Sequence, residues 1–213
     1  QQVKAGKWAT TYLFTGKELE RKKALAIAFA KALNCDCRGA VSAPLGRGNP
    51  APTNVCAVCR RIESNVHPDV KWYGMDEEAN SIKISEVRDF QNWLNLKPFE
   101  AKVKVFIFNQ AERLTAEAQN ALLKSLEEPP PGNVILLLVP SRKSIFDTIS
   151  SRAAEIKVPP FEAEAIQKLL IQEGAKKEEA RFLARMSQGD LHRARRAREE
   201  KWFQKKNDWL DQL

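Results

Sequence analysis

The stretch that decides the fold reads TYLFTGKELERKKALAIAFAKAL and covers residues 11–33. Its first part, Tyr12–Phe14, predicts a short buried strand, and Gly16 opens a turn. The remainder, residues 22–33, predicts a helix, because it consists mostly of strong helix formers with apolar side chains at helical spacing. A strand, a glycine-containing loop and a helix in this order are the parts of a phosphate-binding loop.

The loop departs from the phosphate-binding pattern G-x-x-x-x-G-K-[ST] at two positions. Gly16 fits the first glycine and Lys22 the lysine, but Arg21 replaces the second glycine and Lys23 replaces the Ser or Thr. A side chain at the second glycine obstructs the approach of backbone N–H groups to phosphate, and an ammonium group cannot bind Mg²⁺. We therefore expect nucleotide binding to be lost. The alternative is a basic first turn on an ordinary α/β helix.

Composition limits the class of protein. The chain has 213 residues and is 43% hydrophobic, enough for one good core and a smaller satellite domain. It has no apolar run of membrane-spanning length and no signal peptide at its start, so we expect a soluble, cytoplasmic protein. The net charge of +8 is concentrated in residues 176–206, which hold 11 Lys or Arg against 5 Asp or Glu. Such a surface suits nucleic acid, an acidic partner or an ordinary solvated helical face.

All four cysteines lie in one short window, as Cys35, Cys37, Cys56 and Cys59. In a reducing compartment this clustering favours a metal site, because four thiolates satisfy tetrahedral Zn²⁺. Cys56 and Cys59 have the usual chelating spacing, whereas Cys35 and Cys37 are closer together than usual. We predict a structural zinc site that closes the Gly- and Pro-rich loop between the two pairs. His67 is a further possible ligand, but a His before Pro is more often a turn residue.

The rest of the chain alternates strands and helices and then becomes helical. Apolar runs predict strands at 69–73, 103–108, 133–139 and 154–158, and helices are expected to begin at Ser85 and Thr115. Strands that alternate with helices predict a doubly wound parallel sheet. Beyond Pro159 and Pro160, three helical segments are expected, at 161–172, 176–186 and from 190 onward.

The strand predicted at 103–108 is followed by two neutral amides, Asn109 and Gln110. In an ATPase of this layout the strand should end in Asp-Glu, where the Asp orders Mg²⁺ and the Glu positions the attacking water. Amides keep nearly the same shape but lose the charge and the basicity. This second site is therefore altered in the same direction as the loop at Gly16.

Several stretches resemble the AAA+ subunits of the bacterial DNA polymerase III clamp loader, most closely the delta-prime type. They are LFTGKELERKKALAIAFAKALNC, VCAVCRRIESNVHPDV, LKPFEAKVKVFIFNQAERLTAEAQNALLKSLEEPPP and TISSRA, which cover most of residues 12–160. The resemblance implies a RecA-like α/β domain in residues 1–160, with the zinc module at 35–59, and a three-helix lid domain in residues 161–213. The helical collar domain of full subunits would be absent.

The resemblance also implies roles for individual residues. The ATP-hydrolysing subunits of this family keep intact motifs, whereas the delta-prime type resembles this chain in having degenerate ones, so Gly16 and Lys22 would mark a non-functional nucleotide site. Arg152, within Ser151-Arg152-Ala153, matches the arginine finger that reaches the nucleotide of the adjacent subunit. His192 stands where the lid's sensor arginine would be. Cys37 would replace the family's second zinc cysteine, whose place is at Thr53.

Together, these features predict an ATPase-inactive clamp-loader subunit. It would scaffold a hetero-oligomer and donate Arg152 to a neighbouring ATPase subunit while the complex loads a sliding clamp onto primed DNA. Zn²⁺ is the expected cofactor, and ATP is not expected to bind to this chain. Two alternatives remain open: an active motor ATPase that tolerates the substitutions, and a zinc-stapled module that binds nucleic acid through its basic helices.

Overall fold

The structure, a computed structural model, describes residues 8–35, 56–76 and 79–210. Cys37 and the whole segment between the two cysteine pairs, residues 38–55, lie outside the described residues. The chain divides into two compact units, residues 1–15 with 21–157 and residues 16–20 with 158–213. Each unit has its own hydrophobic core. The identification of an ATPase-type domain in residues 1–160 and a lid domain in residues 161–213 stays a prediction.

Strands and helices alternate along the first unit. Its elements are β1 (Thr11–Thr15), α1 (Leu19–Asn34), α2 (Ala57–Glu63), β2 (Val70–Tyr73), α3 (Ile84–Asn95), β3 (Lys104–Phe108), η2 (Ala111–Arg113), α4 (Ala116–Glu127), β4 (Asn133–Val139), η3 (Arg142–Ser144), α5 (Asp147–Ser150) and β5 (Ala154–Lys157). The strands form a sheet in the order β2-β3-β4-β1-β5, and all of their pairings are parallel. The predicted α/β fold with a parallel sheet is confirmed.

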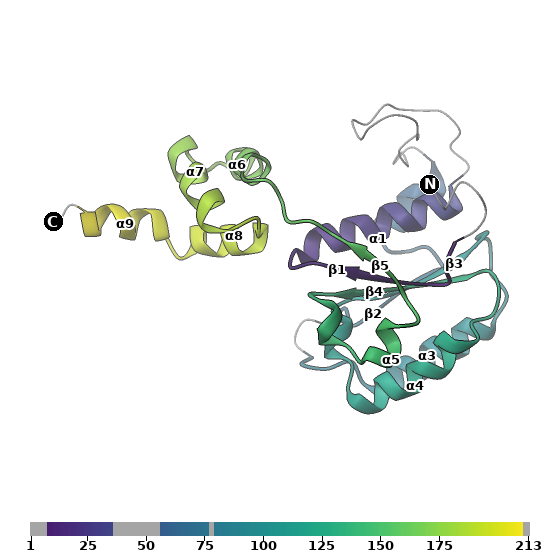
Figure 1. Cartoon of the computed structure of the whole chain (residues 1–213). Helices are drawn as coiled ribbons and strands as arrows, with labels where there is room; N and C mark the ends of the chain where they lie inside the picture. The colour runs from purple at the N-terminus through teal and green to yellow at the C-terminus, as the bar shows by residue number, and fades with distance from the viewer. Residues whose placement is uncertain (1–7, 36–55, 77–78, 211–213) are drawn as a thin grey trace. The chain divides into compact units, whose positions relative to one another are not determined.

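Helices cover both faces of this sheet, with α1 on one side and α3, α4 and α5 on the other (Figure 1). Every residue of β1, β3 and β4 is buried, as expected for central strands of a parallel sheet that is covered on both faces. Phe90 of α3 packs edge-on against Phe106 and Phe108 of β3, with ring centroids 5.0 and 5.2 Å apart. On the opposite face Phe29 of α1 packs against Tyr12 of β1, with ring centroids 4.9 Å apart.

The two predicted helix starts had different outcomes. Thr115 caps α4 as expected, because its Oγ1 accepts a hydrogen bond from the backbone N–H of Ala118 at 3.2 Å. The prediction that Ser85 caps α3 was wrong: the cap residue is Lys83, which makes no side-chain capping bond. The reason lies one residue earlier. Ile82 forms an isolated parallel bridge to Leu114, and this extended pairing fixes the backbone just before the helix begins.

The second unit contains α6 (Ala163–Gln172), α7 (Lys177–Met186), α8 (Leu191–Glu199) and α9 (Trp202–Leu210). The last of the three predicted helical segments is thus divided in two, and the division falls at Lys201, whose φ of 56° is left-handed and cannot continue a right-handed helix. Gly189 before α8 has a φ of 86°, and a Cβ at this position would lie 2.6 Å from Cβ of Pro160, so this turn requires glycine. No helix in the described part of the chain is both long enough and apolar enough to cross a membrane.

Candidate functional site

The carboxyl ends of β1, β3 and β4 bring together the two altered motifs. In the register of the sheet, Thr15 at the end of β1 lies opposite Val139 at the end of β4, and Phe108 at the end of β3 lies opposite Leu137. The loop before α1 follows β1, and Asn109 follows β3. Open parallel sheets bind ligands outside this edge, so both motifs stand where a nucleotide site is expected.

Lys22, which matches the nucleotide-binding lysine, is bonded to its own chain. The residue is 2% exposed, and Nζ donates a hydrogen bond to the backbone carbonyl of Val139 at 2.8 Å. The charge of the Lys22 ammonium group also acts on the carboxyl group of Glu112. Burial raises the pKa of Glu112, and the positive charge of Lys22 opposes that rise. The ammonium group of Lys22 is therefore enclosed by groups of its own chain at this sheet edge.

The two amides after β3 also bond to the chain. Asn109 is buried, and its Nδ2 donates to the carbonyl of Gly74 at 3.2 Å, while Oδ1 is buried without a hydrogen-bond partner among the described residues. Gln110 has a left-handed backbone, with φ 51° and ψ 56°, and its Oε1 accepts a hydrogen bond from Nη1 of Arg113 at 2.9 Å. Neither side chain offers the carboxylate that orders Mg²⁺ or activates water.

The predicted first glycine of the loop is required by the chain itself. A Cβ on Gly16 would lie 2.4 Å from the carbonyl oxygen of Val158, closer than any side chain tolerates. Arg21 and Lys23, the two residues that depart from the phosphate-binding pattern, are half-buried at the start of α1. The presence of Gly16 is therefore explained by backbone packing, with no phosphate needed.

Glu18, which the sequence did not single out, occupies the amino end of α8. The residue is 2% exposed, and Oε2 accepts a hydrogen bond from the backbone N–H of Leu191, the first residue of α8, at 3.0 Å. Burial raises the pKa of Glu18, the Leu191 N–H opposes this, and Asp190 raises it again. A helix amino end attracts anions, and here a carboxyl group of the same chain takes that position. The expected sensor position, His192, is exposed on α8.

Three of the four predicted zinc ligands lie together. The Sγ atoms of Cys35, Cys56 and Cys59 are all within 4.8 Å of one another, and those of Cys35 and Cys56 are 3.6 Å apart. Two sulfurs bound to one tetrahedral Zn²⁺ at about 2.3 Å each are separated by about 3.8 Å, so this spacing fits zinc. The backbone N–H of Cys59 donates to Sγ of Cys56, the cap residue of α2. The predicted fourth ligand, Cys37, lies outside the described residues.

The thiol chemistry of this cluster also fits a cation. Burial raises the pKa of the Cys59 thiol, and the neighbouring Cys35 and Cys56 raise it further. Three adjacent thiolates repel one another unless a positive charge lies between them, and a bound divalent ion supplies that charge and deprotonates its ligands. His67, the alternative ligand, does not belong to this cluster.

Arg152, the predicted finger, follows the short helix α5 and is 37% exposed. Its Nη2 lies 2.9 Å from Oε1 of Glu127 at the end of α4, and its Nη1 donates to the carbonyl of Thr148 at 2.8 Å. The segment before α5 is attached to α4 through buried Gln119, whose Oε1 accepts a hydrogen bond from the backbone N–H of Phe146 at 3.0 Å. Gln119 thus braces the segment before α5, and the guanidinium of Arg152, after α5, contacts its own chain.

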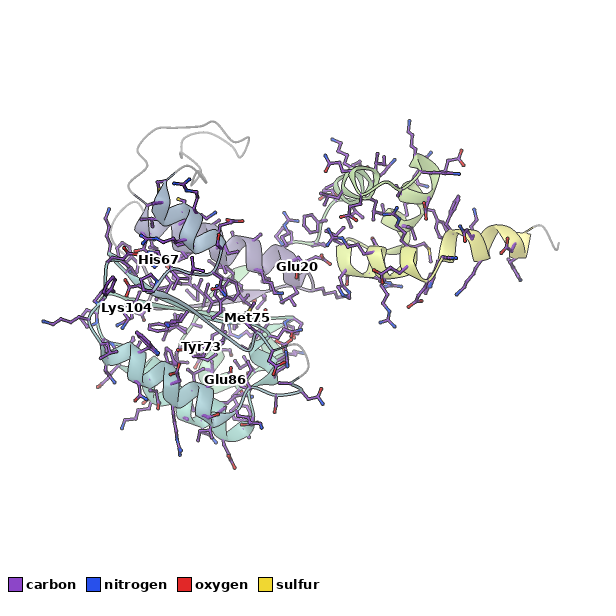
Figure 2. The ribbon with its side chains drawn as sticks, turned by 180° about the vertical axis from the view of Figure 1, so that it is seen from behind. Glu20, His67, Tyr73, Met75, Glu86 and Lys104 are labelled. Carbon is purple, nitrogen blue, oxygen red and sulfur yellow. The ribbon has the colours of Figure 1, made fainter. Side chains whose placement is uncertain are left out.

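The buried polar residue His67 lies at the opposite edge of the sheet. The sequence suggested it only as a possible metal ligand or a turn residue. In Figure 2, His67 and Lys104 lie where β2 and β3 begin, and Met75 lies beyond the end of β2. Nδ1 of His67 accepts the N–H of Asp69, and its Nε2 is 3.4 Å from Oε1 of Glu100. Burial lowers the pKa of His67, while the charges of Glu100 and Asp69 oppose that change. His67 is a buried turn residue.

The five-stranded parallel sheet with helices on both faces is that of an AAA+-type, RecA-like α/β protein. Two solved structures share this fold at low sequence identity. A gamma-subunit-related DNA polymerase III protein from Thermotoga maritima has a TM-score of 0.56 at 24% identity and aligns over 84% of this chain and 53% of its own. The RuvB Holliday junction branch migration motor of the same organism has a TM-score of 0.51 at 11% identity, over 92% and 55%.

The sequence comparisons define the family. A family model described as "DNA polymerase III, delta subunit" matches residues 1–162, so the chain belongs to this family. It is 32% identical to DNA polymerase III subunit delta' of Bacillus subtilis over 83% of the chain and 50% of that protein. For the delta' subunit of Pseudomonas aeruginosa the identity is 31%, over 71% and 43%, and for the tau subunit of Bacillus subtilis it is 32%, over 75% and 26%. The predicted delta-prime resemblance is confirmed, and the chain spans at most half the length of these relatives.

Proposed function

We propose that the chain is a clamp-loader subunit that neither binds nor hydrolyses ATP. In this role it scaffolds a hetero-oligomer with other DNA polymerase III subunits and supplies an arginine finger to a neighbouring ATPase, while the complex loads a sliding clamp onto primed DNA. The observation that carries the proposal is the hydrogen bond from Nζ of Lys22 to the carbonyl of Val139, at a sheet edge without Mg²⁺ carboxylates at positions 109 and 110.

Four substitutions support the loss of ATP chemistry, and each removes a different part of an ATP-hydrolysing site. Arg21 replaces the glycine that lets backbone N–H groups reach phosphate, and Lys23 replaces the hydroxyl ligand of Mg²⁺. Asn109 and Gln110 replace the metal carboxylate and the residue that positions water. The alternative, an active motor ATPase, requires all four losses to be tolerated together.

The direct test is calorimetric titration of the purified full chain with ATP and Mg²⁺, with an intact ATPase subunit of the family as the positive control. The proposal expects no heat of binding and no phosphate release above buffer. Saturable binding that disappears in Lys22→Ala would establish the motor ATPase instead.

The chemistry of Arg152 and its place support the proposed finger role. A guanidinium spreads positive charge and can contact two phosphate oxygens at once, which stabilises the charge that develops during phosphoryl transfer. Arg152 is partly exposed on a short loop beyond α5, and its partner Glu127 is 53% exposed, so the pair can separate at low cost. The finger would act on the ATP of an adjacent subunit.

The cysteine cluster is proposed to hold one structural Zn²⁺. Cys35, Cys56 and Cys59 supply three thiolates, and Cys37 is the expected fourth. With four protein ligands no coordination position is left for substrate, so the ion would stabilise the fold around α2. Metal analysis of protein purified under reducing conditions tests this assignment, and an absence of zinc would refute it.

A further inference from the structure

A cavity lies in the second unit, between α7 and α9. Its volume is about 510 Å³. It is lined by Glu178, Arg181, Phe182, Arg185, Met186, Phe203 and Lys206. None of these residues belongs to the altered nucleotide site or to the cysteine cluster, so their arrangement has to be explained separately.

The floor of the cavity is apolar and partly exposed. Phe182 of α7 and Phe203 of α9 meet with ring centroids 5.7 Å apart and ring planes at 56° to each other. Beside them Met186, at the end of α7, is 42% exposed. Apolar groups that stay exposed around a hollow are typical of binding surfaces, and methionine in particular adapts its shape to a docked partner.

The rim of the cavity is basic. Arg181 and Arg185, one helical turn apart on α7, are both exposed, and among the lining residues that the structure describes only Glu178 is acidic. On α9 the ammonium group of Lys206 lies over both aromatic rings, 4.8 Å from the ring centroid of Phe203 and 5.4 Å from that of Phe182. The cavity therefore combines an apolar floor with three cations at its edge.

We propose that this groove is a docking site for an acidic amphipathic helix of a partner protein. Such a helix would place apolar side chains at i, i+3 or i+4 and i+7 on Phe182, Met186 and Phe203, and would direct Asp or Glu side chains towards Arg181, Arg185 and Lys206. The charge complementarity sets the register and speeds association, and the apolar floor supplies most of the affinity. Nothing in this proposal depends on ATP or on the finger role of Arg152.

The same residues are poorly suited to nucleic acid, although they include cations and aromatic rings. Bases bind to proteins by stacking on a free aromatic face. Here the two rings are inclined to each other, and the ammonium group of Lys206 already lies over one face of each. In the proposed complex, apolar side chains pack against ring edges and Met186, and Lys206 keeps its place over the rings.

The test uses the full chain and a fluorescein-labelled peptide of 16 residues. The peptide has Leu at positions i, i+3, i+4 and i+7 of every two helical turns, so that the leucines share one helix face, and Glu or Asp at the other positions. Fluorescence anisotropy should show saturable binding that weakens as salt is added. Arg181→Glu and Met186→Glu should each weaken binding by about tenfold or more. The first reverses a charge at the rim, and the second places a charge on the apolar floor. The matched control is Arg193→Glu, an exposed arginine on α8 outside the cavity, which should leave the affinity unchanged.

Thermal melts followed by circular dichroism verify that each variant stays folded. A peptide of the same composition with its leucines distributed around the helix should not bind. The proposal fails if both peptides bind equally, or if Met186→Glu has no effect on binding. It also fails if a single-stranded oligonucleotide binds in a way that depends on Arg181, or if sedimentation shows self-association that Met186→Glu abolishes, because the groove would then serve nucleic acid or a second copy of the chain.

Discussion

Nη2 of Arg152 lies 2.9 Å from Oε1 of Glu127, so the proposed finger is paired with the end of α4 in its own chain. Both partners are partly exposed, and surface ion pairs of this kind are worth about 0–1 kcal/mol. The second contact, from Nη1 to the Thr148 carbonyl, is that of an arginine capping the end of a short helix. The ordinary capping role is therefore present in the isolated chain, and a finger role would appear only in an assembly.

The first prediction concerns this distinction. Arg152→Ala should lower the free energy of unfolding of the isolated chain by less than about 1 kcal/mol, because it removes only exposed contacts. In the assembled complex the same change should slow ATP turnover by neighbouring subunits by up to about 10³-fold. Arg152→Lys should not restore it, since an ammonium group lacks the fork geometry of guanidinium.

Glu127→Gln provides the matched control for Arg152, because it removes the ion pair and leaves the guanidinium in place. Turnover by the complex should stay within about twofold of the unmodified value for this variant. If the complex containing Arg152→Ala hydrolyses ATP and loads clamps at the normal rate, the arginine acts only as a helix cap and the chain as a scaffold.

The second prediction concerns Lys22. Because its buried ammonium group donates to Val139, Lys22→Ala should lower the free energy of unfolding by about 1–3 kcal/mol, measured by urea denaturation. In a working phosphate-binding loop the main effect would be on ATP affinity. Lys23→Ala, at the adjacent half-buried position, is the control and should cost less. An ATP-dependent rise in melting temperature that vanishes in Lys22→Ala would contradict the prediction.

The third prediction concerns the metal. One Zn²⁺ per chain should copurify, and Cys59→Ser should lose it, because buried Cys59 is one of the three clustered thiols. Replacement by Co²⁺ should give thiolate charge-transfer absorption, and Cys37→Ser should reduce its intensity if Cys37 is the fourth ligand. The far-ultraviolet circular dichroism of the sheet should be unchanged when a chelator removes the Zn²⁺, since none of the three clustered cysteines lies on a strand. Metal content that is unchanged in Cys59→Ser would exclude this site.

The fourth prediction concerns pH. Burial lowers the pKa of His67 below its ordinary value of 6.5, so the folded chain binds fewer protons at this site than the unfolded chain does. Its contribution to stability is complete above about pH 6.5 and is lost as the pH falls from there through the folded pKa. His67→Asn, which keeps an acceptor for the Asp69 N–H, should flatten the stability profile over this interval. The exposed His192→Asn should not, and equal slopes in the two variants would oppose the assignment.

The fifth prediction concerns Glu18. Burial raises its pKa above the ordinary 4.5, so its carboxyl group contributes stability at low pH that is lost as the pH rises through the folded pKa. Glu18→Gln keeps an acceptor for the Leu191 N–H without the buried charge, and should be more stable than the unmodified chain at pH 7. The difference should shrink towards pH 4.5. Exposed Glu20→Gln is the control, and a loss of stability in Glu18→Gln would mean that the charge itself stabilises α8.

The sequence by itself determined the fold class. Apolar runs such as 133–139 mark strands that are buried on both faces, and their alternation with helices predicts a parallel sheet, because both signals come from local hydrophobicity and connection length. The substitutions at 109 and 110 could also be recognised, since they are changes of residue type at positions defined by a neighbouring strand. Helix boundaries were less secure: a long-range bridge at Ile82, which no local pattern records, placed the start of α3 before Ser85.

Only the tertiary structure decided which groups of the chain Lys22 and Glu18 contact. Lys22 meets Val139 across 117 residues of sequence, and Glu18 meets Leu191 across 173. The residue types at these positions predict a damaged nucleotide site, but they do not reveal which groups of the chain its lysine and its loop contact. Hydrogen bonds between distant segments depend on the register and packing of whole elements. For that reason the residue types alone predict a departure from the phosphate-binding pattern, while the contacts that the lysine and the loop make appear only in the folded chain.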